Sequence, residues 1–210
     1  MSPSPYLIGL TGDVGAGKST VRRWLEAKGA AALDADAVVH ALLSDGGVAC
    51  RAVMDRFGDE VGAPDGGIDR AALARVVFGD AAALVDLETI LHPLVGARTR
   101  AWLASCGAAV AVVEAVKLVE GGLAADCDAV WLVLAASRRR AERVRVRGWD
   151  AAETARRMGA ATPLAPRLAM ATEVIDNTGT PEATVAQLEA AWRRLERRRT
   201  AVGKRPTADA

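Results

Sequence analysis

The stretch from residue 12 to residue 20 constrains the fold of this chain more than any other, because few structures accommodate its spacing of glycines. The stretch consists of Gly12-Asp13-Val14-Gly15-Ala16-Gly17-Lys18-Ser19-Thr20. A short apolar run precedes it at residues 6–10, and an amphipathic pattern follows it to about Gly29. The sequence therefore predicts a buried strand, a glycine-rich turn and a helix in immediate succession.

The glycines in this turn have a physical role. Without a Cβ, the main chain can turn tightly and come close to an anion. Successive N–H groups and the positive end of the following helix then face one concavity. Lys18 can reach the β- and γ-phosphates of a nucleotide, and the Ser19 hydroxyl can bind Mg²⁺. We therefore predict that residues 12–20 bind the phosphates of a nucleotide.

The composition is that of one globular α/β domain. The chain has 210 residues, of which 51% are hydrophobic, and many of these are alanine, so helices should dominate. A net charge of +1 provides no field that would attract nucleic acid or an anionic membrane. No apolar run approaches the length of a membrane span, and the first five residues lack the pattern of a signal peptide.

The three cysteines, Cys50, Cys106 and Cys127, are scattered along the chain. Their spacing matches neither a disulfide framework nor a zinc site. We therefore expect a cytoplasmic protein whose partner is a small molecule rather than nucleic acid or a membrane. We expect it to be a monomer or a weak homo-oligomer.

Acidic residues follow two of the predicted strands. Residues 30–33 end in Asp34-Ala35-Asp36, and residues 108–113 end in Glu114. In an open parallel sheet, ligands bind at the carboxyl ends of the strands, which is also the edge that carries the glycine loop. Asp36 could take the proton of a hydroxyl that attacks the γ-phosphate, or it could cap a helix that begins at Ala37. Glu114 could hold Mg²⁺, often through water, or it could be a helix cap or a solvated edge carboxylate.

Residues 37–107 are predicted to be almost entirely helical, because apolar residues recur there at spacings of three and four. A helical block inserted between strands often forms a second substrate pocket, although a plain helical bundle has the same pattern. Pro93 suits the first turn of a new helix within this block. His92 before it could donate to a substrate phosphate or could be a satisfied structural residue.

Arginine recurs between residues 138 and 147, just after a predicted fourth strand at residues 129–134. A run of cations is usually a solvated face, but kinases of small molecules close an arginine-bearing lid over the phosphates. Arg143 and Arg147 are four residues apart and share a helix face. Both are therefore candidates to bind phosphate within a lid at residues 137–167.

The remaining segments complete the predicted domain. A last strand is expected at residues 173–177, followed by a helix from Pro181 toward Arg199. Arginines near the end of this helix suit the negative end of its dipole, and the lack of interleaved aromatic residues disfavours a nucleic-acid surface. Residues 201–210 are predicted to be a disordered tail.

Together these motifs resemble those of the dephospho-coenzyme A (dephospho-CoA) kinase family. The matching segments are residues 8–20, Leu33-Asp34-Ala35-Asp36, Phe57-Gly58, Ile68-Asp69-Arg70, Leu73, Val77-Phe78, His92-Pro93, Leu118-Val119-Glu120, Arg143, Arg147 and Val174-Ile175-Asp176-Asn177-Thr178-Gly179. The glycine loop is generic to many kinases, whereas its combination with Asp-Ala-Asp, His-Pro and Ile-Asp-Asn is more selective.

The resemblance implies ATP-dependent transfer of a phosphoryl group to the ribose 3′-hydroxyl of dephospho-CoA, the last step of coenzyme A synthesis, with ATP and Mg²⁺ as cofactors. The implied roles are Asp36 as base, the loop with Lys18 and Ser19 on ATP and Mg²⁺, Arg143 or Arg147 as lid arginine, Asn177 near the adenine, and residues 37–107 around the coenzyme A part. The alternatives are another small-molecule kinase, acting on a nucleoside, a nucleotide or a sugar acid, and a catalytically silent nucleotide-binding regulator.

One segment departs from the family's pattern. Where the family usually has Asp, then Pro-Leu-Leu, then Glu, this chain runs from Glu114 to Glu120 without the proline and with Lys117 in place of an apolar residue. Glu114 is one methylene longer than aspartate, which would move Mg²⁺ by a water. Lys117 could contact a phosphate or the diphosphate of the acceptor.

We therefore predict a single α/β domain with the P-loop kinase fold over residues 1–200, with five parallel strands in the order 2-3-1-4-5 flanked by helices. Its core should comprise residues 6–36, 108–136 and 172–199. The helical acceptor region should comprise residues 37–107, and the lid residues 137–167.

Overall fold

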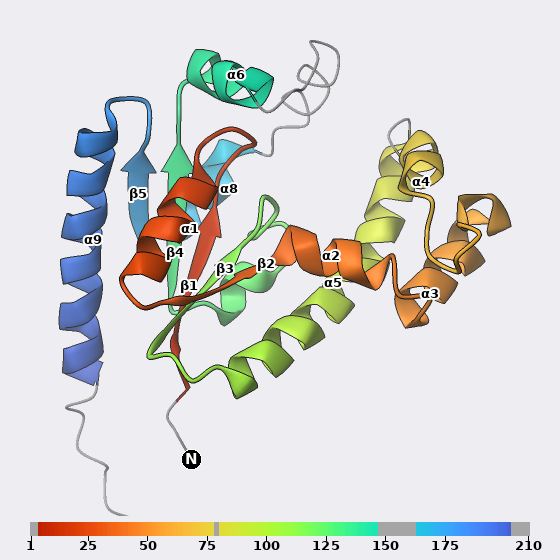
Figure 1. Cartoon of the computed structure of the whole chain (residues 1–210), viewed down its shortest axis with the longest axis horizontal. Coiled ribbons are helices and arrows are strands. Elements are labelled where there is room, and N and C mark those ends of the chain that lie inside the picture. The colour runs from red at the N-terminus through yellow and green to blue at the C-terminus, as the bar shows by residue number, and fades with distance from the viewer. Residues whose placement is uncertain (1–3, 78–79, 147–162, 203–210) are drawn as a thin grey trace, which may run out of the picture.

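The computed structural model of the protein describes residues 4–77, 80–146 and 163–202. Its centre is one sheet of five strands in the order β2-β3-β1-β4-β5 (Figure 1). The strands are β1 (Tyr6–Thr11), β2 (Ala31–Asp34), β3 (Val110–Glu114), β4 (Ala129–Leu134) and β5 (Glu173–Asp176). All neighbouring pairs are parallel, so the predicted fold class and strand order are confirmed.

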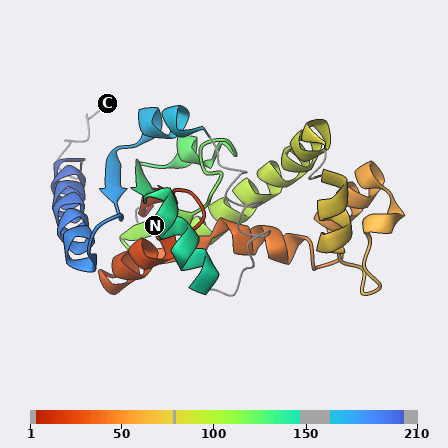
Figure 2. The same ribbon diagram turned by 90° about the horizontal axis from the view of Figure 1, so that it is seen from above.

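Helices connect the strands and cover both faces of the sheet (Figures 1 and 2). They are α1 (Lys18–Ala27), α2 (Ala35–Leu42), α3 (Val48–Phe57), α4 (Arg70–Val77), α5 (Ala81–Ser105), α6 (Ser137–Val146), α8 (Leu164–Met170) and α9 (Pro181–Val202), with the short 3-10 helices η1 (Asp59–Val61) and η2 (Leu123–Asp126). Within the described residues, no helix is both long enough and apolar enough to cross a bilayer.

One face of the sheet packs against α1 and α9. Leu10 of β1 shares a buried core there with Leu25 of α1 and with Leu188 and Trp192 of α9. The rings of Trp24 and Trp192 meet edge to face, with their centroids 6.2 Å apart. The first and last helices are thereby in contact near the C-terminal end of α1.

The other face of the sheet continues into a helical arm. Leu7, Ala111 and Val113 belong to a second core that also contains residues of α2, α3, α4 and α5. Figure 1 shows these helices extending from the β2 side of the sheet, with α3 and α4 farthest from it. Asp69 caps α4, because its Oδ1 accepts from Ala71 N at 2.9 Å.

The structure corrects the predicted helix boundary at Pro93. Residues 81–105 form one continuous helix, α5, with Pro93 inside it rather than at the start of a new helix. An internal proline removes a main-chain hydrogen bond and costs about 3 kcal/mol or more. Leu91 and Val95, on either side of Pro93, are both buried in the second core. Both halves of α5 are therefore packed against the same core.

The end of α9 also differs slightly from expectation. The helix continues to Val202, so the tail predicted from residue 201 begins inside it. Residues 203–210, the rest of that predicted tail, lie outside the described residues.

Candidate active site

The glycine loop lies between β1 and α1, as its sequence predicts, and its glycines are required by the packing around it. Gly12, Gly15 and Gly17 have φ angles of 150°, 78° and 104°, which disfavour any side chain. A Cβ at Gly17 would lie 2.0 Å from Asn177 Nδ2, and one at Gly12 would lie 2.3 Å from Val133 O. The main chain of the loop therefore comes close to β4 and β5 only because no side chain intervenes.

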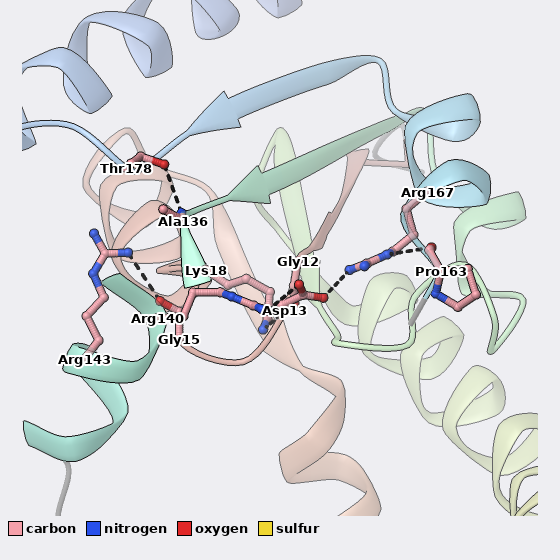
Figure 3. Close-up of polar contacts among 10 residues, drawn as sticks. All are labelled: Gly12, Asp13, Gly15, Lys18, Ala136, Arg140, Arg143, Pro163, Arg167 and Thr178. Atoms are coloured by element: carbon pink, nitrogen blue, oxygen red, sulfur yellow. Dashed lines mark hydrogen bonds and ion pairs between the residues drawn. The ribbon is translucent and has the colours of Figure 1, made fainter. Parts of the chain in front are cut away.

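Lys18 begins α1, and its side chain folds back over the loop. Its Nζ donates to Gly12 O at 2.9 Å (Figure 3), and the residue is 8% exposed. Burial lowers the pKa of Lys18, while the charges of Glu114 and Asp36 act to raise it. A cation is thus held at the mouth of the loop, within electrostatic reach of two acids from neighbouring strands.

Asp34, rather than Asp36, caps α2. Asp34 Oδ1 accepts from Asp36 N at 2.9 Å and from Ala37 N at 3.2 Å. The alternative in which Asp36 is the helix cap is therefore wrong, and the Asp36 carboxylate lies in the first turn of α2. Burial is the largest cause that raises the pKa of Asp36, and the negative charge of Asp34 raises it further. The positive charge of Lys18 acts in the opposite direction. The residue still reaches solvent, as a base that meets an incoming substrate must.

Glu114 ends β3 between β1 and β2, and in register it lies beside Leu10 on one side and Asp34 on the other. It is only 9% exposed, so the alternative of a solvated edge carboxylate is wrong. Arg22 Nε of α1 lies 2.9 Å from Glu114 Oε2. Burial raises the pKa of Glu114, and the positive charges of Lys18 and Arg22 counteract this rise.

Arg143, one of the two predicted lid arginines, is bound to the outer side of the loop. Its guanidinium donates to Gly15 O at 3.3 Å (Figure 3). It also donates to Ala16 O at 3.0 Å and to Asn177 O at 2.8 Å. Asn177 in turn donates through Nδ2 to Ala16 O at 2.8 Å and accepts from Thr184 Oγ1 at 3.0 Å. The second predicted lid arginine, Arg147, lies outside the described residues.

Two further arginines meet the loop at Asp13. Arg167 Nη1 lies 2.8 Å from Asp13 Oδ1, and Arg140 Nη1 donates to Asp13 Oδ2 (Figure 3). Sequence reasoning missed this cluster, although the run of arginines in α6 was visible. Arg140 and Arg167 are buried rather than part of a solvated face, whereas Arg138 and Arg139 are exposed.

Lys117 and His92 lie at the junction of α5 with the segment that follows β3. Lys117 Nζ is paired with Glu88 of α5. His92 is four residues from Glu88, hence on the same helix face, and a Cβ at Gly121 would lie 3.3 Å from its Nε2. The structure thus brings the two predicted acceptor-binding residues to one region and adds Glu88, which the sequence alone did not single out.

Comparison with known protein families matches residues 6–182 to the family described as dephospho-CoA kinase. The chain belongs to the dephospho-CoA kinase family. A dephospho-CoA kinase from Geobacter sulfurreducens is 38% identical over 190 residues, which cover 89% of this chain and 96% of that protein. A dephospho-CoA kinase from Thermobifida fusca is 39% identical over 193 residues, which cover 91% of this chain and 96% of that protein.

Solved structures share the fold of this chain. A crystal structure of a protein from Thermus thermophilus superposes with a TM-score of 0.76 at 31% identity, covering 92% of this chain and 99% of that one. A dephospho-CoA kinase from Campylobacter jejuni, at 19% identity, shares the fold with a TM-score of 0.64. The match covers 91% of this chain and 97% of that one. Members of the dephospho-CoA kinase family are kinases, and the loop with Lys18 has the form of a nucleotide-binding site.

Proposed function

We propose that this protein transfers the γ-phosphoryl group of ATP to the ribose 3′-hydroxyl of dephospho-CoA, giving coenzyme A and ADP. The observation that carries the proposal is the arrangement at the carboxyl edge of the sheet in a chain of this family. There a buried lysine at the end of a glycine loop is within electrostatic reach of two acids, Glu114 at the end of β3 and Asp36 in the first turn of α2. This is the set of groups that phosphoryl transfer to an alcohol requires.

Asp36 is the proposed base. As the acceptor hydroxyl attacks the γ-phosphorus, its proton passes to the Asp36 carboxylate, the new O–P bond forms, and the bond to the β–γ bridging oxygen breaks to release ADP. A raised pKa suits this role, because a stronger base takes the proton more readily.

Lys18 and the loop amides would hold the triphosphate. Lys18 Nζ now donates to Gly12 O, and it would exchange this carbonyl for phosphate oxygens of ATP. The glycines let the loop pack closely in this place, because Cβ atoms at Gly12, Gly15 and Gly17 would collide with Val133, Arg140 and Asn177. Preorganised charge of this kind stabilises the transition state without further rearrangement.

The residues present also fit Mg²⁺. Glu114 is buried at the end of β3, and a carboxylate can accept more than one bond, so it can accept from a water on the ion while Arg22 Nε lies 2.9 Å from Oε2. Ser19 would supply its hydroxyl. When bound, Mg²⁺ would neutralise charge on the β- and γ-phosphates.

The acceptor would lie against the helical region 37–107. Lys117 would exchange Glu88 for the diphosphate of dephospho-CoA, and His92 would donate to the same group. Asn177 would lie near the adenine of ATP, and Arg143 or Arg147 would offset the phosphate charge. We further propose that the protein acts in the cytoplasm as a monomer or weak homo-oligomer, without nucleic acid as a partner.

Incubation with ATP and a panel of acceptors tests the proposal. We expect dephospho-CoA to be converted to coenzyme A, detected by mass and by chromatography against a standard, with equimolar ADP. Turnover of a nucleoside, nucleotide or sugar acid without turnover of dephospho-CoA would establish a different kinase. Binding of ATP without transfer to any acceptor would point to a silent regulator.

A further inference from the structure

The side chain of Asp13 joins two helices to the glycine loop. Its Oδ1 accepts from Arg167 of α8 at 2.8 Å, and its Oδ2 accepts from Arg140 of α6 (Figure 3). The two arginines come from opposite sides of residues 147–162 in the sequence. A single carboxylate therefore ties the loop to both α6 and α8.

All three side chains of this cluster are largely withdrawn from water. The exposed fractions are 22% for Asp13, 10% for Arg140 and 1% for Arg167. Exposed ion pairs contribute little to stability, but loss of one partner from a buried pair leaves an uncompensated charge and is costly. Separating Asp13 from its two arginines is therefore more costly than separating the exposed ion pairs of this protein.

Helix α6 also presses directly on the loop. A Cβ at Gly15 would lie 2.7 Å from Arg140 O, so α6 and the loop are in close contact. Arg143 of α6 donates to Gly15 O and Ala16 O, whose peptide units carry the N–H groups of Ala16 and Gly17. A shift of α6 would therefore move loop amides that face the nucleotide.

We propose that Asp13 is a positioning residue for ATP, an inference that rests on the proposed function of the loop as the ATP site. Asp13 acts through Arg140 and Arg167, because it holds α6 and α8 where the loop amides fit a triphosphate. Both of its oxygens are engaged by guanidinium groups, so its own contact is with the arginines rather than with ATP.

Two effects of the Asp13 charge oppose each other. A carboxylate near a triphosphate is repulsive, so its removal would by itself tighten binding. The two guanidinium groups bonded to Asp13 offset most of this repulsion, whereas loss of the carboxylate removes the ion pairs that join both of them to the loop. The positional effect is therefore the larger one, and loss of the carboxylate weakens ATP binding.

Calorimetric titration with MgATP, without acceptor, tests the inference on the full chain. We expect Asp13→Asn to raise the Kd by about tenfold, within the range by which residues in a packed network modulate a ligand site. Asp13→Glu keeps the charge and should recover most of the affinity. The matched control is Glu189→Gln, which removes an exposed ion pair with Lys28 at 2.8 Å and should leave the Kd unchanged.

Steady-state kinetics separates positioning from a general loss of structure. Asp13→Asn should raise the KM for ATP and leave the KM for dephospho-CoA unchanged. An equal rise in both constants, or a Kd for ATP that is unchanged or lower, would overturn the inference. Failure of the proposed function would look different, because wild-type protein would bind ATP without phosphorylating dephospho-CoA, and the Kd comparison would still decide the role of Asp13.

A second variant covers the case in which Asp13→Asn does not fold. Arg140→Gln leaves the pair of Asp13 with Arg167 in place, and α6 keeps an anchor in the bond from Ala136 N to Thr178 Oγ1 at 3.0 Å. We expect this variant to fold and to raise the Kd for ATP in the same direction. An unchanged Kd in Arg140→Gln would equally contradict the inference.

Discussion

Arg22 Nε lies 2.9 Å from Glu114 Oε2, so a cation from the first helix faces the carboxylate that ends β3. The two groups form an ion pair in which the Glu114 side chain is only 12% exposed. Arg22 thereby opposes the rise that burial causes in the pKa of Glu114. The charge of Lys18 opposes the same rise.

This relationship predicts that Glu114 affects the requirement for Mg²⁺. Glu114→Gln removes the charge but keeps the shape, so the Mg²⁺ concentration for half-maximal activity should rise by about tenfold, as for other outer partners of a metal. This concentration is measured by titrating the activity with Mg²⁺ at saturating ATP. Glu26→Gln is the control, because Glu26 is the other acid paired with Arg22. An equal rise in both variants would assign the effect to Arg22 instead.

Lys18→Ala should abolish the use of ATP. The variant loses the cation nearest to the developing charge, and we expect turnover to fall by at least about two powers of ten. Lys28→Ala, at the other end of the same helix, removes an exposed lysine and should retain normal turnover. Measurable activity near the wild-type rate in Lys18→Ala would exclude the loop as the catalytic phosphate site.

Asp36→Asn should retain ATP binding and lose turnover by roughly two to four powers of ten, the usual contribution of a general base. Single-turnover kinetics with dephospho-CoA measures the chemical step, and calorimetry measures the affinity for ATP. A normal rate in this variant would show that another group takes the proton.

The same substitution should increase stability at neutral pH. The pKa of Asp36 is raised above its ordinary value of 3.8, so its charged form is disfavoured in the folded state. That penalty is fully present above the folded-state pKa and absent below the unfolded-state pKa. In thermal unfolding, the Tm of Asp36→Asn should therefore be higher than that of the wild type at pH 8. The difference in Tm should shrink as the pH falls toward 4. A constant difference across this range would contradict the assigned shift.

Lys117→Ala should affect the acceptor and not the nucleotide. Loss of a charge-assisted bond to the acceptor diphosphate should raise the KM for dephospho-CoA by roughly tenfold, with an unchanged KM for ATP. Glu88→Gln removes the competing anion, so it should lower the KM for dephospho-CoA or leave it unchanged. If Lys117 serves only to bind Glu88, both variants should instead lose stability equally, with unchanged KM values.

The glycine loop and the strand order could be predicted because the signals for them are local or topological. Spacing within residues 12–20 determines which main-chain conformations are possible, and parallel topology brings the ends of β2 and β3 to the edge that carries the loop. The position of Asp36 followed from the same reasoning. Its role as a helix cap was wrong, because Asp34 has the extended conformation that a cap requires.

Side-chain partners across long sequence separations were not predictable in this way. Asp13 and Arg167 are 154 residues apart, and Lys117 and Glu88 are 29 apart. Periodicity indicates which face of an element is buried, but it does not indicate which charged side chain of another element will meet it. Pro93 fails as a boundary for a related reason, since burial of Leu91 and Val95 depends on packing that no local pattern reports.

The amino-acid sequence by itself determined the sheet, the phosphate-binding loop and the set of acids at its edge, because short-range backbone geometry and chain topology are sufficient for these. Only the tertiary structure decided which arginines are buried against the loop and which acid each cation meets. Those choices depend on how distant helices pack, and the energy of a charge depends on the burial and the partners that packing provides.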